Sequence, residues 1–562
     1  MPVKNQRGPR RKTVAVIGGG ISGLAAAWEL TGGSNGPDAT SPQVVLLEAD
    51  ARLGGKIATG SICGQSVDVG PDGFLGRRRE AELLCREVGL GDALVPIAAN
   101  GASLWARGRL RPLPDGLALG VPTRFWPLLR SGILSKHDLA RVLLDIVSPR
   151  PDTRNPLGDR AVGPLVARKL GTAVVDSLVD PLIGGIHAGT VSDMSAAAVF
   201  PMLLAVGQSR GSLMKALRRA VAKDATPTGS PDPTEPPIDV SVDESPESGD
   251  SDPGDSDPGD SDPGDSDPGD SECREGGGAA LPAFWSLDGG LQSLVARLVV
   301  LLEERGVTIR TASSVDLIDR QDPRTNEAAG ADGPTWVLHS TTGPVEADGV
   351  IVTSPAPEAA RLIGPHSQDA ATLLNGIDYA SVSIVTISYL NDAFGDRLGE
   401  LRGTGGLIPR HSLFHLKDKA EHYEALTTAF TYLSAKWPNL AREGEVLIRA
   451  SVGRWGDDRP LKMSDSEIVS TVVSELATVL AIEGAPREAT VTRWQSALPQ
   501  YRVHHLLRVA GINSALSRLP SLAVAGAAYN GIGIPACIAS GRNAARSILQ
   551  TPVLQGTKNT DR

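Results

Sequence analysis

The first residues whose types and spacing could do chemistry are glycines that follow a short, mostly apolar stretch at 13–17. Gly18 permits a tight turn, Gly20 lets the backbone approach a pyrophosphate, and Gly23 allows a helix to pack closely on a strand. A helix over 22–30 would direct its positive dipole end toward the phosphates. The pattern predicts a dinucleotide site that comprises Gly18, Gly19, Gly20, Ser22 and Gly23.

A second apolar stretch, 44–47, ends at Glu48, where a strand would place the carboxylate to accept hydrogen bonds from a ribose. An acidic residue at this point disfavours NADP, because it would repel the 2′-phosphate. Ala49 follows directly, and we include it in the expected site.

The residues after Glu48 indicate which dinucleotide the site binds. The run continues as Arg52-Leu53-Gly54-Gly55-Lys56, which resembles the second fingerprint of the amine oxidase–protoporphyrinogen oxidase superfamily of flavoproteins. The resemblance implies that Gly55 lets the chain pass close to the flavin, while Arg52 and Lys56 counter the charge of the phosphates. It also implies FAD, bound noncovalently, since Cys537 is not an attachment point in the family that the chain resembles.

Further motifs narrow the resemblance to the bacterial oxygen-dependent coproporphyrinogen III and protoporphyrinogen oxidase family. They lie in order at 69–73, 181–189, 285–291, 497–501 and 525–541, so the likeness spans nearly the whole chain. Glycines before a helix near Pro535 would direct a second helix N-terminus at the flavin. The residues that the resemblance implies near the cofactor are Gly70, Pro71, Asp72, Gly73, Val315, Trp494, Gly526, Ile532, Gly533 and Ile534.

The resemblance implies conversion of coproporphyrinogen III to coproporphyrin III in haem biosynthesis, with hydride loss to the flavin and reoxidation by oxygen that releases hydrogen peroxide. The pyrrole N–H groups can lose their own protons, so we assign no catalytic side chain. A protoporphyrinogen IX oxidase and an amine or carotenoid oxidoreductase are the alternatives. A non-enzymatic relative of the prenylated-GTPase escort type is disfavoured, because 52–56 and 531–535 are both retained.

Several carboxylates on the substrate would call for cationic side chains. Animal and plant members of the family carry an arginine that faces a propionate, in a stretch that aligns with 102–107, whereas this chain has Ala102. Arg107, Arg109 and Arg111 are the candidates to supply that charge, and exposure to solvent is the alternative for all three.

Composition excludes several other classes. No apolar stretch approaches the ~18 residues that a membrane-spanning helix needs. The four cysteines lie far apart without a C-x-x-C pair, which argues against a disulfide framework or a metal site and favours the cytoplasm. His411 and His415 lack an evident third ligand, and Gly207-x-Ser209-x-Gly211 would need a strand before it to act as a hydrolase elbow. No nucleic-acid partner is expected.

The net charge of −10 comes from one segment, because residues 224–275 hold 18 acidic residues against a single arginine. Four Asp-Ser-Asp-Pro-Gly repeats begin at Asp250, and this composition predicts a disordered insertion, with calcium binding as the alternative. The remaining chain is mildly basic, which suits an anionic substrate or membrane surface and equally an ordinary surface. Peripheral contact with the inner face of the cell membrane and transfer of product to a ferrochelatase are further expectations.

The elements predict an α/β protein: a Rossmann-like discontinuous FAD-binding domain, a mixed α+β substrate domain and a helical lobe. We expect the FAD-binding parts at 13–98, 281–360 and 506–550, a helical lobe that faces substrate or membrane at 99–222, the acidic insertion at 223–280, and the substrate domain at 361–505.

Overall fold

The computed structural model describes residues 10–147, 158–207, 211–224, 282–321, 336–401, 403–415 and 422–555. Residues 222–281 form a unit of their own, of which only 222–224 are described, and the rest of the chain forms the other unit. The predicted disorder of the acidic insertion therefore lies outside the described residues. In the described part, no helix is both long and apolar enough to cross a bilayer.

A five-stranded parallel sheet forms the centre of the nucleotide-binding part, which confirms the predicted α/β class. Its order is β12-β2-β1-β16-β24, so strands from distant parts of the chain lie side by side. Alternate residues of β1 enter different cores, with Val14 and Val16 on one face of the sheet and Ala15 and Ile17 on the other. The strands are β1 (Thr13–Ile17), β2 (Gln43–Leu47), β12 (Thr308–Arg310), β16 (Gly349–Val352) and β24 (Leu522–Val524).

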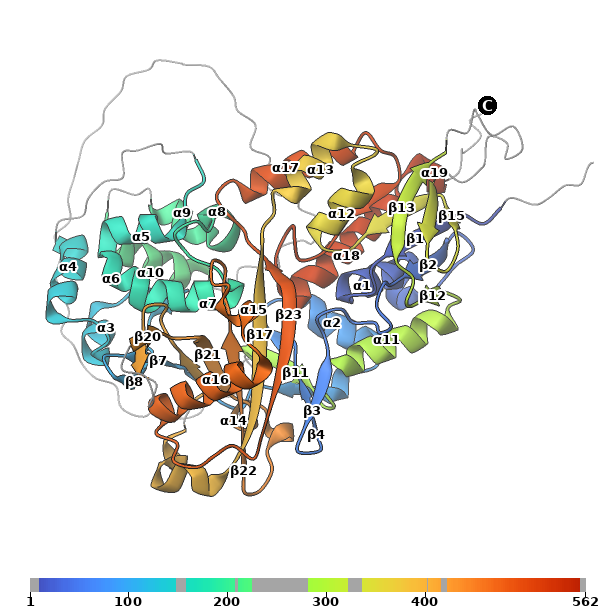
Figure 1. Ribbon diagram of the computed structural model, residues 1–562. Helices are drawn as coiled ribbons and strands as arrows, with labels where there is room; N and C mark the ends of the chain where they lie inside the picture. Colours follow the sequence, from blue (N-terminus) through green and yellow to red (C-terminus); the bar gives the residue numbers. More distant parts are fainter. Residues whose placement is uncertain are drawn as a thin grey trace, which may run out of the picture. The chain divides into compact units, whose positions relative to one another are not determined.

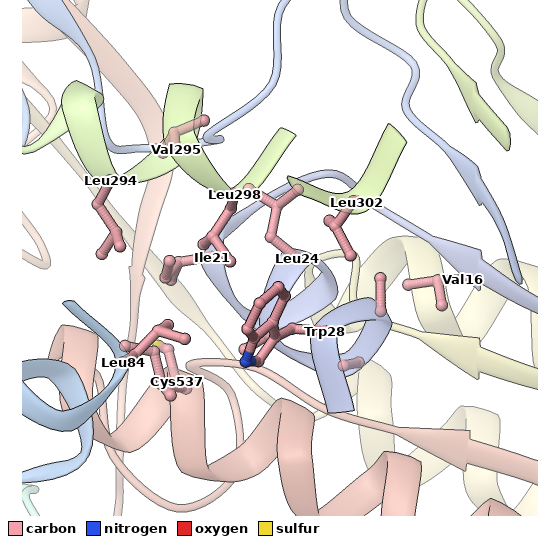
Figure 2. Packing of buried hydrophobic residues seen from close by; sticks show 14 of the residues in the cluster. Val16, Ile21, Leu24, Trp28, Leu84, Leu294, Val295, Leu298, Leu302 and Cys537 are labelled. Carbon is pink, nitrogen blue, oxygen red and sulfur yellow. The ribbon is translucent and has the colours of Figure 1, made fainter. Parts of the chain in front are cut away.

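Helices cover both faces of this sheet (Figure 1). On one face, Leu294, Leu298 and Leu302 of α11 point toward α1, where Ile21 and Leu24 meet them (Figure 2). This core holds α1 (Ile21–Leu30), α2 (Glu80–Glu87), α11 (Gln292–Glu304) and α18 (Ile534–Leu549). The other face packs against β13 (Val315–Arg320), β14 (Trp336–Ser340), β15 (Val345–Ala347), α12 (Ala356–Ile363), α13 (Gln368–Asn375) and α17 (His505–Leu516).

A seven-stranded, mainly antiparallel sheet forms the second layer, in the order β23-β17-β22-β21-β18-β7-β8. The side chains of β22 alternate: Ile448 and Ala450 pack with α16 (Asp465–Leu480), whereas Leu447 packs with Trp437 on the other face. The strands are β7 (Ser103–Ala106), β8 (Arg109–Pro112), β17 (Tyr379–Leu390), β18 (Gly405–Leu407), β21 (Thr427–Tyr432), β22 (Glu445–Val452) and β23 (Glu488–Pro499).

The strands β7 and β8 come from a segment that the sequence assigns to the helical lobe. They form a hairpin that joins the seven-stranded sheet through β18. Each strand is only four residues long, and an alternating pattern of that length cannot be told from a loop in the sequence. These residues form strands because they pair with a strand that is distant in the sequence.

The described residues between 125 and 224 are largely helical, as predicted, and form a hydrophobic core of their own. Gly207 is the last residue of a helix, so the residues directly before the Gly207-x-Ser209-x-Gly211 motif do not form the strand that a hydrolase elbow needs. Ser209 itself lies outside the described residues. The helices are α3 (Phe125–Ser131), α4 (Lys136–Val147), α5 (Val162–Leu170), α6 (Thr172–Val174), the π-helix η3 (Val175–Gly184), α7 (Gly185–His187), α8 (Ala196–Val199), α9 (Pro201–Gly207) and α10 (Leu213–Asp224).

Short elements lie between these larger ones. They include the hairpin of β3 and β4 and the three-stranded sheet of β5, β11 and β6. Their bounds are β3 (Thr59–Ile62), β4 (Gln65–Asp68), β5 (Phe74–Leu75), β6 (Leu94–Pro96), β9 (Leu117–Ala118), β10 (Val121–Pro122), β11 (Phe284–Leu287), β19 (Leu413–His415), β20 (His422–Glu424), α14 (Leu433–Lys436), α15 (Arg459–Lys462) and α19 (Pro552–Gln555).

Candidate functional site

The carboxyl ends of the parallel strands meet at one edge of the five-stranded sheet. There β1 leads into Gly18, β2 into Glu48, β16 into Thr353 and β24 into Ala525. The chain continues from β1 to β2 on one side and from β16 to β24 on the other, so its connections diverge between β1 and β16. Ligands of open α/β sheets bind at such a point.

In the glycine loop after β1, a Cβ would meet neighbouring protein atoms at Gly18, Gly19 and Gly23 but not at Gly20. A Cβ at Gly23 would lie 1.9 Å from the Gly18 carbonyl oxygen, so helix and strand pack as the motif predicts. Gly18 has φ +106°, and Thr353 Oγ1 donates to its carbonyl at 2.9 Å. A Cβ at Gly20 would meet nothing within 4 Å, so open space lies before the first turn of α1.

The N-terminus of α1 has no side-chain cap. Gly20 is its N-cap residue, and glycine offers no oxygen to the free backbone N–H groups of the first turn. The Ser22 side chain, in that turn, is buried. Unpartnered N–H groups beside open space suit an anionic ligand.

Glu48 is anchored beside this loop. Its Oε2 accepts from Gly19 N at 2.6 Å and its Oε1 from Asp50 N at 2.8 Å. A carboxylate has about four lone-pair positions, so both oxygens can still accept from a ribose. Ala49 is exposed. The predicted contact of Glu48 with a ribose stays a prediction.

Arg52 fixes the second glycine loop through backbone carbonyls. Its guanidinium donates to Gly55 O at 2.5 Å and to Ile57 O at 3.1 Å, and it lies 5.9 Å from the Trp494 ring. The loop touches the first one, because Gly54 N donates to Gly19 O at 2.9 Å and a Cβ at Gly55 would lie 3.2 Å from Gly20 Cα. Lys56, the last residue of this loop, is exposed.

The loop 70–73 crosses directly over the second glycine loop. A Cβ at Gly70 would lie 1.8 Å from Lys56 O, and one at Gly73 would lie 2.7 Å from the Trp437 ring, so both positions require glycine. Pro71 is half-buried between them. Trp494, on β23, donates through Nε1 to Val69 O at 2.9 Å, which brings this predicted residue to the same loop.

Asp72 is the charged centre of that loop and joins it to the seven-stranded sheet. It accepts from Lys436 Nζ at 2.8 Å and from Trp437 Nε1 at 3.1 Å, and Arg449 Nη1 lies 3.7 Å away. Burial alone would raise the pKa of Asp72, but Lys436 and Arg449 hold that pKa well below its usual range. Asp72 is therefore an anion with two cations around it.

The C-terminal part supplies the third side of the site. Gly533 is the N-cap residue of α18, again without a side-chain cap, and it is exposed. Ile532 is half-buried and Ile534 buried. Gly526 N donates to Ser540 Oγ at 3.0 Å, and a Cβ at Gly526 would lie 3.9 Å from Ser22 Oγ. The predicted residues of both ends of the chain thus meet at α1 and α18.

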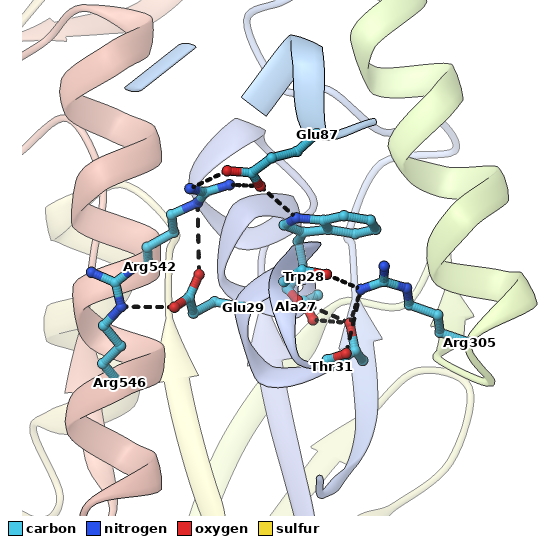
Figure 3. A network of polar contacts seen from close by, with 9 residues as sticks. Ala27, Trp28, Glu29, Thr31, Glu87, Arg305, Arg542 and Arg546 are labelled. Carbon is cyan, nitrogen blue, oxygen red and sulfur yellow. Dashed lines mark hydrogen bonds and ion pairs between the residues drawn. The ribbon is translucent and has the colours of Figure 1, made fainter. Parts of the chain in front are cut away.

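Ion pairs fix α1 and α18 against each other at the far end from the glycines (Figure 3). Arg542 of α18 lies 2.5 Å from Glu87 of α2 and 3.8 Å from Glu29 of α1, while Arg546 lies 2.7 Å from Glu29. Trp28 Nε1 donates to Glu87 at 3.0 Å. A Cβ at Gly541 would lie 2.0 Å from Ser22 O, so the helices are in backbone contact.

Val315, the predicted adenine contact, is buried at the start of β13. It lies next to the chain that leaves β2, because Ser313 N donates to Glu48 O at 2.7 Å and Ala312 N to Asp50 O at 2.9 Å. This placement is compatible with an adenine near Glu48, and the contact itself stays a prediction.

The residues at this edge fit a dinucleotide. Besides the two uncapped helix ends, buried Ser354 Oγ and Gln292 Oε1 have no hydrogen-bond partner. Gln292 Oε1 lies 3.2 Å from the position of a Cβ on Gly54, within the glycine loops. Open space and unpartnered polar groups in one place are what a bound dinucleotide would fill.

Arg107, Arg109 and Arg111 lie away from this edge. Arg107 and Arg109 are exposed on the β7–β8 hairpin, and Arg111 donates to the carbonyls of Ala106 and Ser131. Arg109 lines a cavity of about 560 Å³ with Tyr432 and the end of α16. The core that holds α16 lies on the face of the sheet opposite Leu447 and Trp437. A substrate role for these arginines stays a prediction.

Residues that the sequence left unassigned complete the site. Tyr501 OH accepts from Gly531 N at 2.7 Å and donates to Ala527 O at 2.5 Å. It lies in the motif at 497–501, for which the sequence predicts no role of individual residues. Thr353, Lys436 and Arg449 carry no local sequence signal, because their partners lie hundreds of residues away. Within the described ranges, His, Cys, Asp and Glu side chains form no group of three that could hold a metal.

Comparison with known proteins agrees with this geometry. The model of the family "Flavin containing amine oxidoreductase" matches residues 21–549. The coproporphyrinogen III oxidase of Propionibacterium freudenreichii is 34% identical over 95% of this chain and 90% of its own length. That of Bacillus subtilis is 30% identical over 96% and 98%. A crystal structure from Exiguobacterium sp. 255-15, provisionally named a protoporphyrinogen oxidase, superposes with a TM-score of 0.73 at 27% identity, covering 98% of this chain and 100% of that one.

Proposed function

The chain belongs to the family of flavin-containing amine oxidoreductases, and from that premise we propose that it is an FAD-dependent oxidase that converts coproporphyrinogen III to coproporphyrin III. The observation that carries the proposal is likeness along the whole chain to coproporphyrinogen III oxidases, 30–34% identical over 95–96% of its residues. The substrate is a porphyrinogen and the cofactor is FAD.

The residues that would hold FAD come from both ends of the chain. We propose that the backbone of Gly18–Gly20 and the first turn of α1 bind the pyrophosphate, and that Glu48 binds the ribose. The loops at 52–56 and 70–73 and the segment 526–534 would surround the flavin. When bound, FAD supplies a ring that accepts hydride from the substrate.

The chain's own residues would act on the reaction electrostatically. The uncapped end of α18 at Gly533 presents the positive end of a dipole, which stabilises negative charge developing beside it. Lys436 and Arg449 add two cations at Asp72, which offset the negative charges of Asp72 and the neighbouring Asp68. We propose that oxygen is the final acceptor and hydrogen peroxide the second product, and that the pyrrole N–H groups release their protons without a basic side chain.

An assay with two porphyrinogens tests the proposal. FAD-loaded protein is incubated separately with coproporphyrinogen III and with protoporphyrinogen IX, and porphyrin fluorescence and peroxide are followed. We expect faster fluorescence growth with coproporphyrinogen III, with peroxide formed alongside. A faster reaction with protoporphyrinogen IX would select the alternative substrate, which the name of the Exiguobacterium protein favours. Fluorescence with neither substrate would refute both.

Peripheral membrane contact is a further part of the proposal. On α3 and α4, Trp126 is 66% exposed and Leu143 and Leu144 are 41% and 44% exposed, so apolar side chains face outward from the helical segment. We expect the protein to float with anionic vesicles and Trp126→Ser to float less. Leu413→Ser, at a leucine that is 61% exposed on β19, is the matched control. We also propose transfer of the porphyrin to a ferrochelatase, which co-purification tests.

A further inference from the structure

A second group of charged side chains lies beside the motif at 181–189. Arg454 follows β22 directly, and its Nη2 is buried without a hydrogen-bond partner. Asp180 Oδ2 lies 3.7 Å from Arg410 Nε, and Arg410 Nη2 donates to Gly189 O at 3.2 Å. An unpartnered buried guanidinium nitrogen is costly, so a ligand that accepts from it would be stabilised there.

Charged side chains of both signs surround Arg454. The carboxylates that act on it are Asp180 and Asp457, and the cations are Arg410 and Arg459. Asp457 already binds the guanidinium of Arg459 at 2.6 and 2.8 Å, and Asp180 Oδ1 accepts from Val191 N at 3.0 Å. Burial, and then repulsion by Arg410, lower the pKa of Arg454 to about 10. Asp457 and Asp180 are thus already engaged by other groups, and the Nη2 of Arg454 keeps no hydrogen-bond partner.

A small cavity opens at this group. It has a volume of about 10 Å³ and is lined by Arg454, Asp180, Thr428 and several glycines, so it holds one water-sized group but no ring. Gly185 at its wall is exposed, and a Cβ there would meet only the Leu407 side chain at 3.8 Å. The space suits the tip of a flexible side group that enters from the Gly185 side.

The cavity lies near the flavin-facing loop. His187 O, in the same segment, accepts from Gln500 Nε2 at 3.0 Å, and the His187 ring lies 6.0 Å from the ring of Tyr501. The Tyr501 hydroxyl in turn binds Gly531 N at 2.7 Å. The Tyr501 side chain thus connects the 181–189 segment, part of which lines the cavity, to the loop before α18.

We propose that Arg454, with Arg410 beside it, binds one carboxylate side chain of the porphyrinogen, whose tip enters this cavity. The inference rests on the proposed function and names the part of the substrate that this chain recognises. The free Nη2 can donate a charge-assisted hydrogen bond to one carboxylate oxygen, which is the size of group that the cavity holds. The proposal adds arginines after β22 and after β18 to Arg107, Arg109 and Arg111, whose own role toward the substrate stays a prediction.

The test compares coproporphyrin III, which has carboxylates, with its tetramethyl ester, which has the same ring without the charges. Both are titrated into the FAD-loaded protein in the same dilute detergent, and binding is followed by fluorescence. We expect Arg454→Gln to weaken binding of the acid about tenfold or more and to leave binding of the ester unchanged. Arg454→Lys keeps the charge but does not place its donor where Nη2 lies, so its affinity for the acid should lie between those of the wild type and Arg454→Gln.

Two further variants test whether a nearby negative charge opposes binding of the acid and whether the effect is specific to this group of residues. Asp180→Asn keeps an acceptor for Val191 N and removes a competing negative charge, so it should strengthen binding of the acid only. Arg487→Gln, at an arginine paired with Glu445 at the other end of β22, is the matched control and should change neither ligand. In kinetics, Arg454→Gln should raise KM for coproporphyrinogen III with little change in kcat.

The outcomes separate the inference from the function beneath it. If the wild-type protein oxidises coproporphyrinogen III while Arg454→Gln changes acid and ester binding equally, or changes neither, the carboxylate site is refuted and the function stands. If the wild-type protein neither oxidises a porphyrinogen nor binds either probe, the proposed function fails and the inference fails with it.

Discussion

Gly20 and Gly23 lie in the same turn, yet their surroundings differ. A Cβ at Gly20 meets no protein atom within 4 Å, and its φ of −70° suits any residue, so Gly20→Ala should change the free energy of unfolding by less than about 0.5 kcal/mol. The added methyl group would occupy the space where the cofactor approaches. We expect FAD affinity to fall about tenfold or more, measured by titration of flavin fluorescence.

Gly23→Ala is the matched control three residues along. Its Cβ would lie 1.9 Å from a backbone oxygen, so it should destabilise the apoprotein by about 2 kcal/mol or more. An apoprotein of normal stability with Gly23→Ala, or normal FAD affinity with Gly20→Ala, would contradict the roles assigned to these glycines.

Asp68, at the base of the 70–73 loop, makes stability depend on pH. Burial raises the pKa of this carboxyl from 3.8 to about 6. The folded state therefore holds a proton that the unfolded state has lost, and the resulting stabilisation, present at low pH, disappears as pH rises through 6. The change is about 2 kcal/mol between about pH 4 and pH 8. In urea unfolding, the free energy of unfolding of Asp68→Asn should rise by this amount relative to that of the wild type over that pH range. A difference between the two proteins that does not change with pH would contradict the prediction.

At the scale of elements, the contacts between α1, α2 and α18 decide whether the two uncapped helix ends face the same ligand. Arg542 is 13% exposed and lies between Glu87 and Glu29, so Arg542→Met leaves Glu87 without this ion pair and Glu29 with Arg546 alone. We expect it to lower the free energy of unfolding by about 3 kcal/mol. Arg546→Met, at a side chain that is 55% exposed, should cost less than about 1 kcal/mol. Equal effects in denaturant unfolding would contradict a buried network.

The same elements show what the sequence can predict. The strand β1, the glycine turn and α1 follow from a local pattern, and Gly533 at the start of α18 follows from glycines before a proline. Arg542 and Glu87 are 455 residues apart, and neither carries a signal of the other. The proposed role of Arg454 has no sequence signal either, because it depends on Asp180 and Arg410, which only the fold brings close to Arg454. Local propensity predicts elements, whereas long-range charge pairs need the tertiary structure.

At the scale of the whole molecule, the cofactor site joins segments that begin at residue 18 and end near residue 534. A ligand that binds all of them stabilises the folded chain by about 2.7 kcal/mol at a free concentration 100 times its Kd. FAD should therefore raise Tm with concentration. It should also slow hydrogen exchange together in α1, in 48–56 and in the first turns of α18, because each amide group there exchanges only when the shared site opens.

The helical segment provides the internal control for that experiment. The helices α4, α5 and α10 have a hydrophobic core of their own, so FAD should change their exchange little beyond the effect on global unfolding. Protection confined to α1 and 48–56 would mean that the N-terminal loop binds the nucleotide while α18 does not contribute. Protection that appears in all three segments at the same FAD concentration would require one site built from both ends of the chain, because separate sites would saturate at different concentrations.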